Sequence, residues 1–417
     1  MPLTLRVGWR NLWRNRRRTA LTAAGVAFAV FLVVSSMCLQ FGSYAMQEQT
    51  ATSLLAGHLQ LLNPEYPDDQ RLEANLTDAT ELAGRVAGAP GIASVAPRVE
   101  AFALASAGER SFGAQILGVD PAAERRVVDF HQRIVEGSHL AGPDQAVLGQ
   151  ALARNLGVGV GEEVVLLGNA NQGGVAAMVV TVTGVFRTGM AEVDRSLLLA
   201  DIRAVQQAFD LGDRAHRLVV RTTNLRGVEE IAAELRSRLP ARWPEGAGRA
   251  APLEVQTWHQ VLPDLRQAIE IDRLSGQFFY WIIMILVAFS VVNTFIMTVF
   301  ERTREFGMLL AIGMRPARIM LMLQWEARFR WVIGAGAGVA LAAGLMGWLS
   351  RTGIYLGEAI EQLASQMYMP TRLYPVFEAE ALLTAPLVLL LGTQIAAVLP
   401  SLRIRGLEPM EALRVAV

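Results

Sequence analysis

The 417-residue chain contains no lysine, so all 38 of its basic residues are arginine. A Walker A loop needs a lysine to reach the β- and γ-phosphates of ATP, and a Schiff-base enzyme needs an amine, so the chain contains neither. The single cysteine, Cys38, excludes an intrachain disulfide. The 38 acidic residues balance the arginines to a net charge of +0, which disfavours a protein that binds nucleic-acid phosphates.

Charged residues are scarce, at 18%, whereas hydrophobic residues make up 52% of the chain. Four stretches of about 20 or more residues carry no charge, which is the length that a helix needs to cross the hydrocarbon core of a bilayer. They are Thr19–Gln47, Leu274–Phe300, Trp331–Ser350 and Ala381–Leu402. One such stretch is compatible with a buried helix of a soluble enzyme, but the four together predict a protein with four transmembrane helices.

Arginines are distributed unevenly around these stretches, and cytoplasmic flanks of membrane helices collect them. They crowd the segments before the first stretch, between the second and third, and after the fourth, whereas the segment between the third and fourth is mainly acidic. This predicts that both termini are cytoplasmic. The basic leader and the small residues Gly42, Ser43 and Ala45 are also compatible with a cleaved signal peptide, but the apolar stretch is long for that role.

Residues 48–273 have a mixed polar composition, so we expect them to form a folded domain outside the membrane. Strand-like and helix-like segments alternate in it, which predicts an α+β fold in two lobes. Pro240–Pro252 is rich in proline, glycine and alanine and is predicted to be a loop. Thr257 and Gln260 then form a capping box, and a helix that is kinked or begins at Pro263 leads as a stalk into the second span.

The predicted fold class is therefore membrane α-helical, with four transmembrane helices and a large extracytoplasmic α+β domain inserted between helices 1 and 2. The expected segments are a cytoplasmic amphipathic helix (1–18), transmembrane helix 1 (19–47), the α+β domain with its stalk (48–273), transmembrane helix 2 (274–300), a cytoplasmic helix and loop (301–330), transmembrane helix 3 (331–350), an outer loop (351–380), transmembrane helix 4 (381–402) and a cytoplasmic tail (403–417).

Patterns that carry enzyme chemistry are missing from the chain. The five histidines show no short-range ligand pairing, and no GxSxG motif stands beside a plausible triad. Gly157, Gly159 and Gly161 do not have the GxGxxG spacing, and we interpret them as a helix stop and a tight turn. We therefore expect no catalytic, cofactor or metal site in this chain.

Small and polar residues interrupt the apolar stretches. Small residues spaced four apart let helices approach closely, either within one subunit or between two. Polar groups in hydrocarbon indicate interhelical hydrogen bonds or a substrate path. The helix-packing candidates are Gly334, Gly338 and Gly344, and the candidate intramembrane polar contacts are Asn293, Thr294 and Gln394.

Three segments resemble the permeases of the MacB/FtsX type, also called type VII ABC transporters. They are NLWRNRRRTALTAAGVAFAV from Asn11, ERTREFGMLLAIGMRPARI from Glu301 and LPSLRIRGLEPMEALR from Leu399. VLGQALARNLGVGVGEEVVLL from Val147 and VTGVFRTGMAEVD (182–194) are most similar to the lipoprotein-releasing branch, which includes the LolC and LolE subunits. The second segment is amphipathic, so it lies on the lipid surface or docks a cytoplasmic partner.

The resemblance implies a dimer with a second permease copy or a paralogue, and two copies of a separate cytoplasmic ATPase that binds ATP and Mg²⁺. The chain itself is then not an enzyme and holds no cofactor. ATP binding closes the inner ends of the spans, and the stalk moves the outer domain, which is mechanotransmission. The residues implied to contact the ATPase are Glu301, Arg302, Arg304, Glu305, Phe306, Gly307, Leu309 and Ile312.

The implied function is the extraction or movement of a lipoprotein or other hydrophobic substrate at the outer leaflet of the bacterial inner membrane, with the large domain in the periplasm. The alternatives are MacB-like efflux of drugs, peptides or siderophores through an adaptor, and FtsX-like signalling to a periplasmic hydrolase. In one lipoprotein-releasing subunit a long loop captures a soluble carrier. The matching connection here, Asn169–Met178, is short and rich in Gly and Ala, which argues against direct capture of a carrier.

Overall fold

The computed structural model describes residues 3–14, 16–171, 173–225, 227–245, 249–355 and 372–402. The predicted cytoplasmic tail (403–417) and the middle of the predicted outer loop (356–371) lie outside these residues. The chain divides into two compact units, which are described separately. The helical unit comprises Met1–Ala45, Ile269–Tyr355 and Arg372–Val417, and the α+β unit comprises Met46–Ala268 and Leu356–Thr371.

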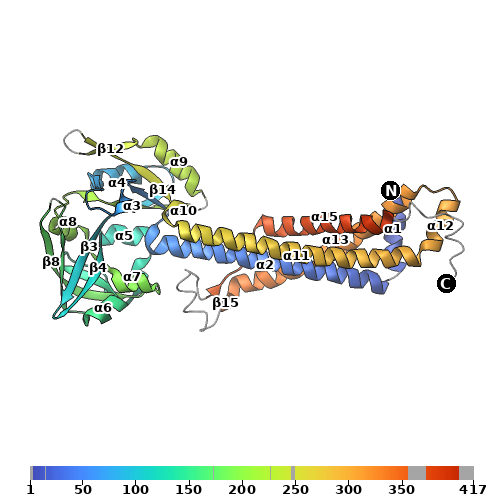
Figure 1. Cartoon of the computed structure of the whole chain (residues 1–417), viewed down its shortest axis with the longest axis horizontal. Coiled ribbons are helices and arrows are strands. Elements are labelled where there is room, and N and C mark those ends of the chain that lie inside the picture. Colours follow the sequence, from blue (N-terminus) through green and yellow to red (C-terminus); the bar gives the residue numbers. More distant parts are fainter. Residues whose placement is uncertain are drawn as a thin grey trace. The chain divides into compact units, whose positions relative to one another are not determined.

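Long helices form the helical unit (Figure 1). Within the described residues, four helices are long and apolar enough to cross a membrane. They are α2 (Arg16–Ala51), α11 (Pro263–Glu301), α13 (Pro316–Thr352) and α15 (Ala379–Ser401). Helix α13 begins well before the uncharged stretch that it contains, because Gly313, with a φ of 93°, ends the preceding helix and Pro316 suits a first turn.

The four long helices share apolar cores. One cluster joins all four through residues such as Val30, Ile283, Ala342 and Leu389. The outer surfaces of the same helices stay apolar; Leu21, for example, is 76% exposed. Helices that are hydrophobic on all sides, including the exposed side, are what a lipid environment requires. After α13, the two-residue strands β15 (Ile354–Tyr355) and β16 (Arg372–Leu373) pair with each other.

Two of the three predicted packing glycines lie where helices touch. A Cβ atom on Gly334 would lie 2.6 Å from the carbonyl oxygen of Ala23 on α2, and one on Gly338 would lie 2.5 Å from that of Ala27. A Cβ on Gly344 would meet no atom within 4 Å among the described residues. Gly344 follows Gly338 by six residues, so it faces away from α2. Among the described residues, Gly344 therefore does not serve packing within this subunit, and packing between two subunits stays a prediction for it.

The α+β unit is built on one sheet, in which the described residues form ten strands. Their order is β14-β1-β11-β3-β4-β9-β6-β8-β5, and β7 pairs with both β3 and β8. The pairings close a ring through β3, β4, β9, β6, β8 and β7. The strands are β1 (Leu59–Leu62), β3 (Ile92–Ala107), β4 (Arg110–Val119), β5 (Ile134–Gly137), β6 (Gln145–Gly149), β7 (Glu163–Asn169), β8 (Val175–Phe186), β9 (Leu197–Asp201), β11 (Arg217–Thr222) and β14 (Glu254–Thr257).

Strand β3 belongs to two parts of the main sheet. Its first half pairs with β11, whereas its second half pairs with β7 inside the ring. The interior of the ring is apolar, with small residues such as Ala103 and Ala105 facing larger ones such as Ile116 and Leu166. Alternating small and large side chains fill the limited space inside a closed ring of strands.

Short helices connect and cover the strands. Gly157 ends α6 in the left-handed conformation, with a φ of 74°, as the predicted helix stop requires. The helical segments are η1 (Thr52–Ala56), α3 (Tyr66–Asp69), α4 (Ala79–Ala87), α5 (Pro121–Val127), η2 (Phe130–Arg133), α6 (Gln150–Leu156), α7 (Ala191–Ser196), α8 (Ile202–Ala208), α9 (Val228–Arg238) and α10 (Trp258–Val261).

The loop predicted over Pro240–Pro252 is instead a hairpin. Strands β12 (Arg242–Glu245) and β13 (Arg249–Pro252) pair antiparallel. Trp243 holds the hairpin, because its indole is buried and donates a 2.8 Å hydrogen bond to the Thr77 carbonyl. The composition of the stretch could not reveal this contact with a distant segment. The predicted capping box of Thr257 and Gln260 is confirmed at α10, and α11 begins at Pro263.

Candidate functional site

A short helix, α12 (Thr303–Ala311), follows α11 and contains most of the residues that the family resemblance implies to contact an ATPase. Its apolar side is anchored in the helical unit. Phe306 is 0% exposed and belongs to a cluster with Val299, Ile319 and Leu323 from the flanking helices. Burial of one aromatic side chain fixes such a short helix, which would not be stable alone in water.

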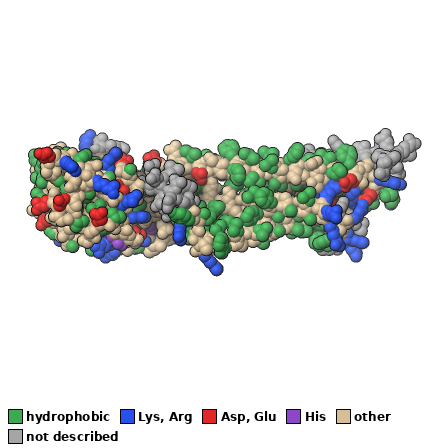
Figure 2. All heavy atoms as spheres, turned by 90° about the horizontal axis from the view of Figure 1, so that it is seen from below, with side chains coloured by type: hydrophobic (Ala, Val, Ile, Leu, Met, Phe, Trp, Pro, Cys, Tyr) green, Lys and Arg blue, Asp and Glu red, His purple; other side chains and the backbone are tan. Residues whose placement is uncertain are grey.

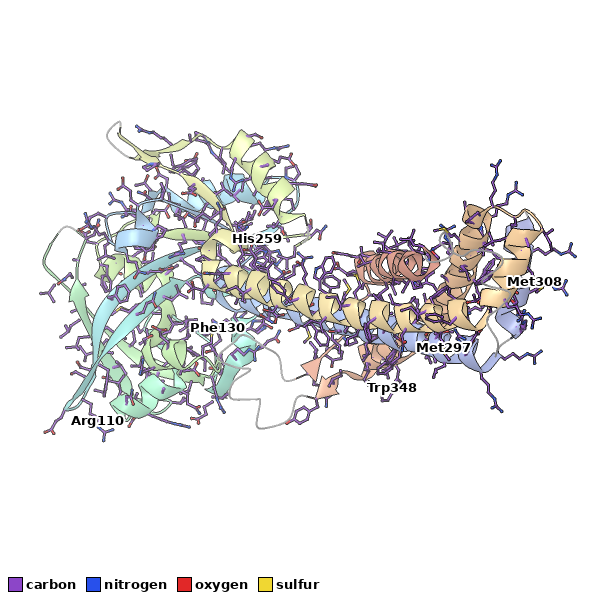
Figure 3. All side chains as sticks on the ribbon, turned by 45° about the vertical axis from the view of Figure 1, so that its right-hand side comes forward. Arg110, Phe130, His259, Met297, Met308 and Trp348 are labelled. Atoms are coloured by element: carbon purple, nitrogen blue, oxygen red, sulfur yellow. The ribbon has the colours of Figure 1, made fainter. Side chains whose placement is uncertain are left out.

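Apolar side chains are exposed to solvent on the side of α12 that does not pack against the helical unit. Ile312, the residue that follows the helix, is 84% exposed, and Met308, labelled in Figure 3, is 46% exposed. Gly313 turns the chain directly afterwards and keeps Ile312 at the tip of the turn. Contiguous exposed apolar side chains mark an interaction surface on a protein or a membrane.

Ion pairs tie α12 to the neighbouring helices. Glu305 pairs with Arg14 of α1 (Leu3–Arg14) and, at 2.9 Å, with Arg302. Burial acts to raise the pKa of the Glu305 carboxyl, but hydrogen bonds from the two arginines outweigh burial and hold that pKa below its usual value. The hydrogen bond to Glu305 also raises the pKa of Arg14. The carboxylate therefore stays ionised and keeps α1 attached to α12.

The network continues into the long helices. Glu301 pairs with Arg18 of α2, Arg302 contacts Glu326 at 3.3 Å, and Glu326 pairs with Arg330 one turn later on α13. Figure 2 shows arginines gathered at the end of the helical unit where Figure 1 places α1 and α12. Charged residues of α1, α2, α11 and α13 thus meet next to α12.

The residues predicted to contact an ATPase differ in exposure: some are exposed, some are half-buried, and two are buried. Arg304 and Ile312 are exposed, as is Glu301, while Leu309 is half-buried. Arg302 and Glu305 are half-buried and engaged in ion pairs. Phe306 and Gly307 are buried within the chain, so neither can touch a partner directly, and we correct their predicted role from contact to anchoring. The sequence alone did not show which side of this helix faces its own chain.

Among the described residues, the side chains of the three candidate intramembrane polar residues form no hydrogen bond between helices. The Thr294 hydroxyl donates within α11 to Ser290 at 2.9 Å, and Asn293 is exposed on that helix. Both side-chain polar atoms of Gln394 are buried without a partner among the described residues. The backbone of Thr294 does connect helices, because its carbonyl accepts a 2.6 Å hydrogen bond from Arg18.

A polar tie between α2 and α11 was not predicted. The Tyr44 hydroxyl donates to Asp272 at 2.6 Å, and Gln40, one turn earlier, donates to the same carboxylate at 3.2 Å. Tyr280 donates to Gln40 at 2.8 Å. A Cβ on Gly276 would lie 2.5 Å from the Gln40 amide, so glycine permits the approach. The signal in the sequence was two polar residues four apart near the end of an apolar helix.

An apolar cavity of about 240 Å³ lies beside this tie, between α2, α11 and α15. Met37, Phe41 and Trp281 line it, and the Arg273–Glu380 pair, at 3.6 Å, is also part of its wall. The cavity is therefore mainly apolar, with one ion pair in its wall. This combination suits the binding of an amphipathic molecule.

His216 has a structural role in the α+β unit. His216 is 0% exposed, and its Nδ1 accepts a 3.0 Å hydrogen bond from the Glu100 amide. Burial lowers the pKa of His216 to about 4, so the ring is neutral at physiological pH. Within the described part of the chain, no three His, Cys, Asp or Glu side chains are placed to hold a metal ion.

The sequence of this chain matches two known domain families. Residues 19–238 match the MacB-like periplasmic core domain, and residues 277–409 match the FtsX-like permease C-terminal domain. The chain belongs to the MacB/FtsX family of ABC transporter permeases. The family resemblance expected from the sequence is thus confirmed, and this permease is a multi-pass protein of the inner membrane.

Relatives of the permease include the lipoprotein-releasing system transmembrane protein LolC of Neisseria meningitidis, at 26% identity over 98% of this chain and 98% of LolC. The pyoverdine export ATP-binding/permease protein PvdT of Pseudomonas syringae is 25% identical over 82% of this chain but only 51% of PvdT. Among solved structures, the periplasmic region of MacB from Actinobacillus actinomycetemcomitans aligns at 15% identity with a TM-score of 0.36, covering 52% of this chain and 94% of that chain.

Proposed function

We propose that this permease binds a separate cytoplasmic ABC ATPase through α12 and couples ATP hydrolysis to movement of its periplasmic domain. The observation that carries the proposal is the two-sided character of the α12 segment. Phe306 anchors one side, and Ile312, at 84% exposure, stands open on the other. A partner that covers Ile312 would gain the burial of a large apolar side chain, worth about 2 kcal/mol.

The proposed orientation puts both termini and α12 in the cytoplasm and the α+β unit in the periplasm. The arginines gathered near α1 and α12 support it, because cytoplasmic flanks are enriched in arginine. Chain continuity supports it as well, since α11 is one uninterrupted helix whose two ends, Pro263 and Glu301, lie on opposite sides of its apolar window. The cytoplasmic site of the tail (403–417) is part of the same proposal.

Transmission of movement is proposed to use α2 and α11 as levers. At about 1.5 Å per residue, each is roughly 55 Å long, which exceeds the thickness of the hydrocarbon core. Tyr44, Gln40 and Asp272 tie the two helices to each other at one end, and the Arg18–Glu301 pair ties them at the other. Two helices that are joined at both ends move together.

The proposed substrate is a lipoprotein or another amphipathic molecule taken from the outer leaflet. The alignment with LolC supports this because it covers nearly all of both chains, whereas the alignment with PvdT covers about half of PvdT. The mainly apolar cavity between α2, α11 and α15, with one ion pair in its wall, has the matching chemistry. Efflux through an adaptor, as an export permease would perform, is the second candidate. FtsX-like signalling to a hydrolase remains the third.

Association partners are also proposals: two ATPase copies and a second permease copy or a paralogue. Direct capture of a soluble carrier has little support, because β7 and β8 are joined by a tight connection in which Ala170 accepts a hydrogen bond from Gly173.

Affinity purification of the full chain from its native membrane tests the proposal. We expect an ABC ATPase to co-purify with the wild type and Ile312→Asp to reduce its recovery by about tenfold. Val175→Asp is the matched control, because Val175 is a similarly exposed apolar residue, at 77%, in the α+β unit. Equal ATPase recovery with Ile312→Asp would contradict the coupling role.

A further inference from the structure

A small polar cavity lies behind α12, enclosed by α1, α2, α11 and α13. Its volume is about 110 Å³, and polar or charged side chains form its whole lining. Two of them are deeply buried, since Glu326 is 2% exposed and Arg330 is 6% exposed. Burial of charged side chains at the end of membrane helices costs free energy unless charges of the opposite sign neutralise them.

The charges around this cavity do not balance. Among the described residues, four arginines but only two glutamates, Glu301 and Glu326, line the cavity. A third glutamate, Glu305, lies outside the lining and pairs with Arg14 and Arg302, so each of the three glutamates has an arginine partner. The arginines are Arg14, Arg18, Arg302 and Arg330. One guanidinium charge is therefore in excess. Arg14 and Glu301 are exposed, but Glu326 and Arg330, which also line the cavity, are buried. An excess cation in such a site favours the binding of an anion.

Hydrogen-bond donors also lack acceptors there. Arg330 donates to Glu326 through Nη2, and its guanidinium lies 5.4 Å from the centre of the Phe295 ring, but among the described residues its Nε and Nη1 atoms are buried without a hydrogen-bond acceptor. The same holds for the Nδ2 amide of Asn11 on α1, which lines the same cavity. Buried donors without acceptors are rare in native proteins, because each has lost its hydrogen bonds to water without replacing them. Water could accept these bonds but could not neutralise the charge.

We propose that this cavity, hereafter the phosphate cavity, binds the phosphate group of an anionic membrane lipid. A guanidinium presents its N–H groups as a fork that matches phosphate oxygens. Basic pockets between transmembrane helices on the cytoplasmic side are suited to anionic lipid headgroups. The inference rests on the proposed function only for the choice of the cytoplasmic leaflet.

Exposed tryptophans next to the cavity indicate that it lies at the level of the lipid headgroups in the membrane. Trp9 and Trp13 on α1 are 46% and 55% exposed, and tryptophan is enriched at the membrane–water interface. Trp9 packs edge-on against Phe329 of α13, with ring centroids 5.3 Å apart, so α1 is held against the membrane helices. A lipid phosphate in the cavity would join α1 and α13 to the ion pairs that hold α12. Headgroup composition would then tune the coupling helix.

Native mass spectrometry of the full chain in detergent tests the proposal with phosphatidylglycerol, phosphatidylcholine and inorganic phosphate as probes. We expect one phosphatidylglycerol per chain to be retained about tenfold better than phosphatidylcholine. Arg330→Gln and Asn11→Asp should each remove this preference. Arg328→Gln is the matched control, because Arg328 lies on the same helix but is exposed and stacks on Trp325.

Asn11→Asp separates loss of binding from loss of folding. Its carboxylate would supply the missing anion from within the chain, so we expect the melting temperature to stay equal or rise while lipid retention falls. Equal retention of the two lipids, or unchanged retention in both variants, would overturn the proposal.

If inorganic phosphate alone displaces phosphatidylglycerol, free phosphate is the ligand and the lipid assignment is wrong. If a chain ending at Leu402 gains lipid, the acidic tail residues fill the cavity instead. Co-purified ATPase, measured on the same samples, reports the proposed function independently.

Discussion

The hydroxyl of Tyr44 on α2 donates a 2.6 Å hydrogen bond to the carboxylate of Asp272 on α11. These residues lie more than 200 positions apart in the chain, and each belongs to a helix that continues into the membrane-spanning window. The bond joins the long helix that precedes the strands of the α+β unit to the long helix that follows them. It is therefore placed to make them move as one lever.

Removal of the Tyr44–Asp272 hydrogen bond should weaken the coupling of ATP hydrolysis to substrate movement, but it should not reduce insertion of the protein into the membrane. We expect Tyr44→Phe to leave the amount of membrane-inserted protein and co-purified ATPase unchanged, while substrate movement per ATP hydrolysed falls. A hydrogen bond to a charged group contributes about 1.5–3 kcal/mol, so the melting temperature should fall as well. Tyr355→Phe is the control, because Tyr355 is 56% exposed. Full coupling in Tyr44→Phe would show that the tie is not used.

Helix packing at Gly338 gives a second expectation. A valine there would place its Cβ 2.5 Å from the Ala27 carbonyl and 2.9 Å from Val30, so α13 would have to move away from α2. Overpacking of this kind costs about 1–3 kcal/mol. Gly338→Val should therefore lower the melting temperature and the monodisperse fraction in size-exclusion chromatography. Gly344→Val should change neither, and similar behaviour of the two variants would refute the assigned packing.

Acid should destabilise the α+β unit through His216. Its pKa is lowered from 6.5 to about 4 in the folded protein, so the unfolded chain binds more protons between these values. Stability is therefore fully present above pH 6.5 and decreases as the pH falls towards 4, by up to about 3 kcal/mol. Hydrogen exchange of β3 and β11 in the full chain should report the loss. His216→Asn keeps an acceptor for the Glu100 amide but cannot titrate, so its pH dependence should be flatter; an equally steep dependence would exclude His216 as the cause.

Local patterns in the sequence predicted much of this fold. Four uncharged stretches predicted the helices that contain them, and the capping box at Thr257 and the stop at Gly157 were read from single positions. These features depend on neighbouring residues alone, through helix length, capping and backbone conformation. The family resemblance followed from contiguous motifs in the same way.

Contacts between distant segments were not predictable. The β12–β13 hairpin depends on Trp243 reaching Thr77, and the ring of strands depends on β7 pairing with two partners. At the candidate site, the sequence placed Phe306 and Ile312 together in one amphipathic segment. Which of the two faces the chain's own core depends on α11 and α13, which a single sequence does not position.

Site-specific photo-crosslinking on α12 tests the coupling role most directly. A photoreactive amino acid is placed at position 312 in one chain and at position 306 in another, and each is irradiated in native membranes. We expect position 312 to crosslink to an ABC ATPase and position 306 to give only products within the permease. A crosslink to lipid alone from position 312, with no ATPase adduct under conditions in which ATP-dependent transport proceeds, would contradict the assignment of α12 as the coupling helix.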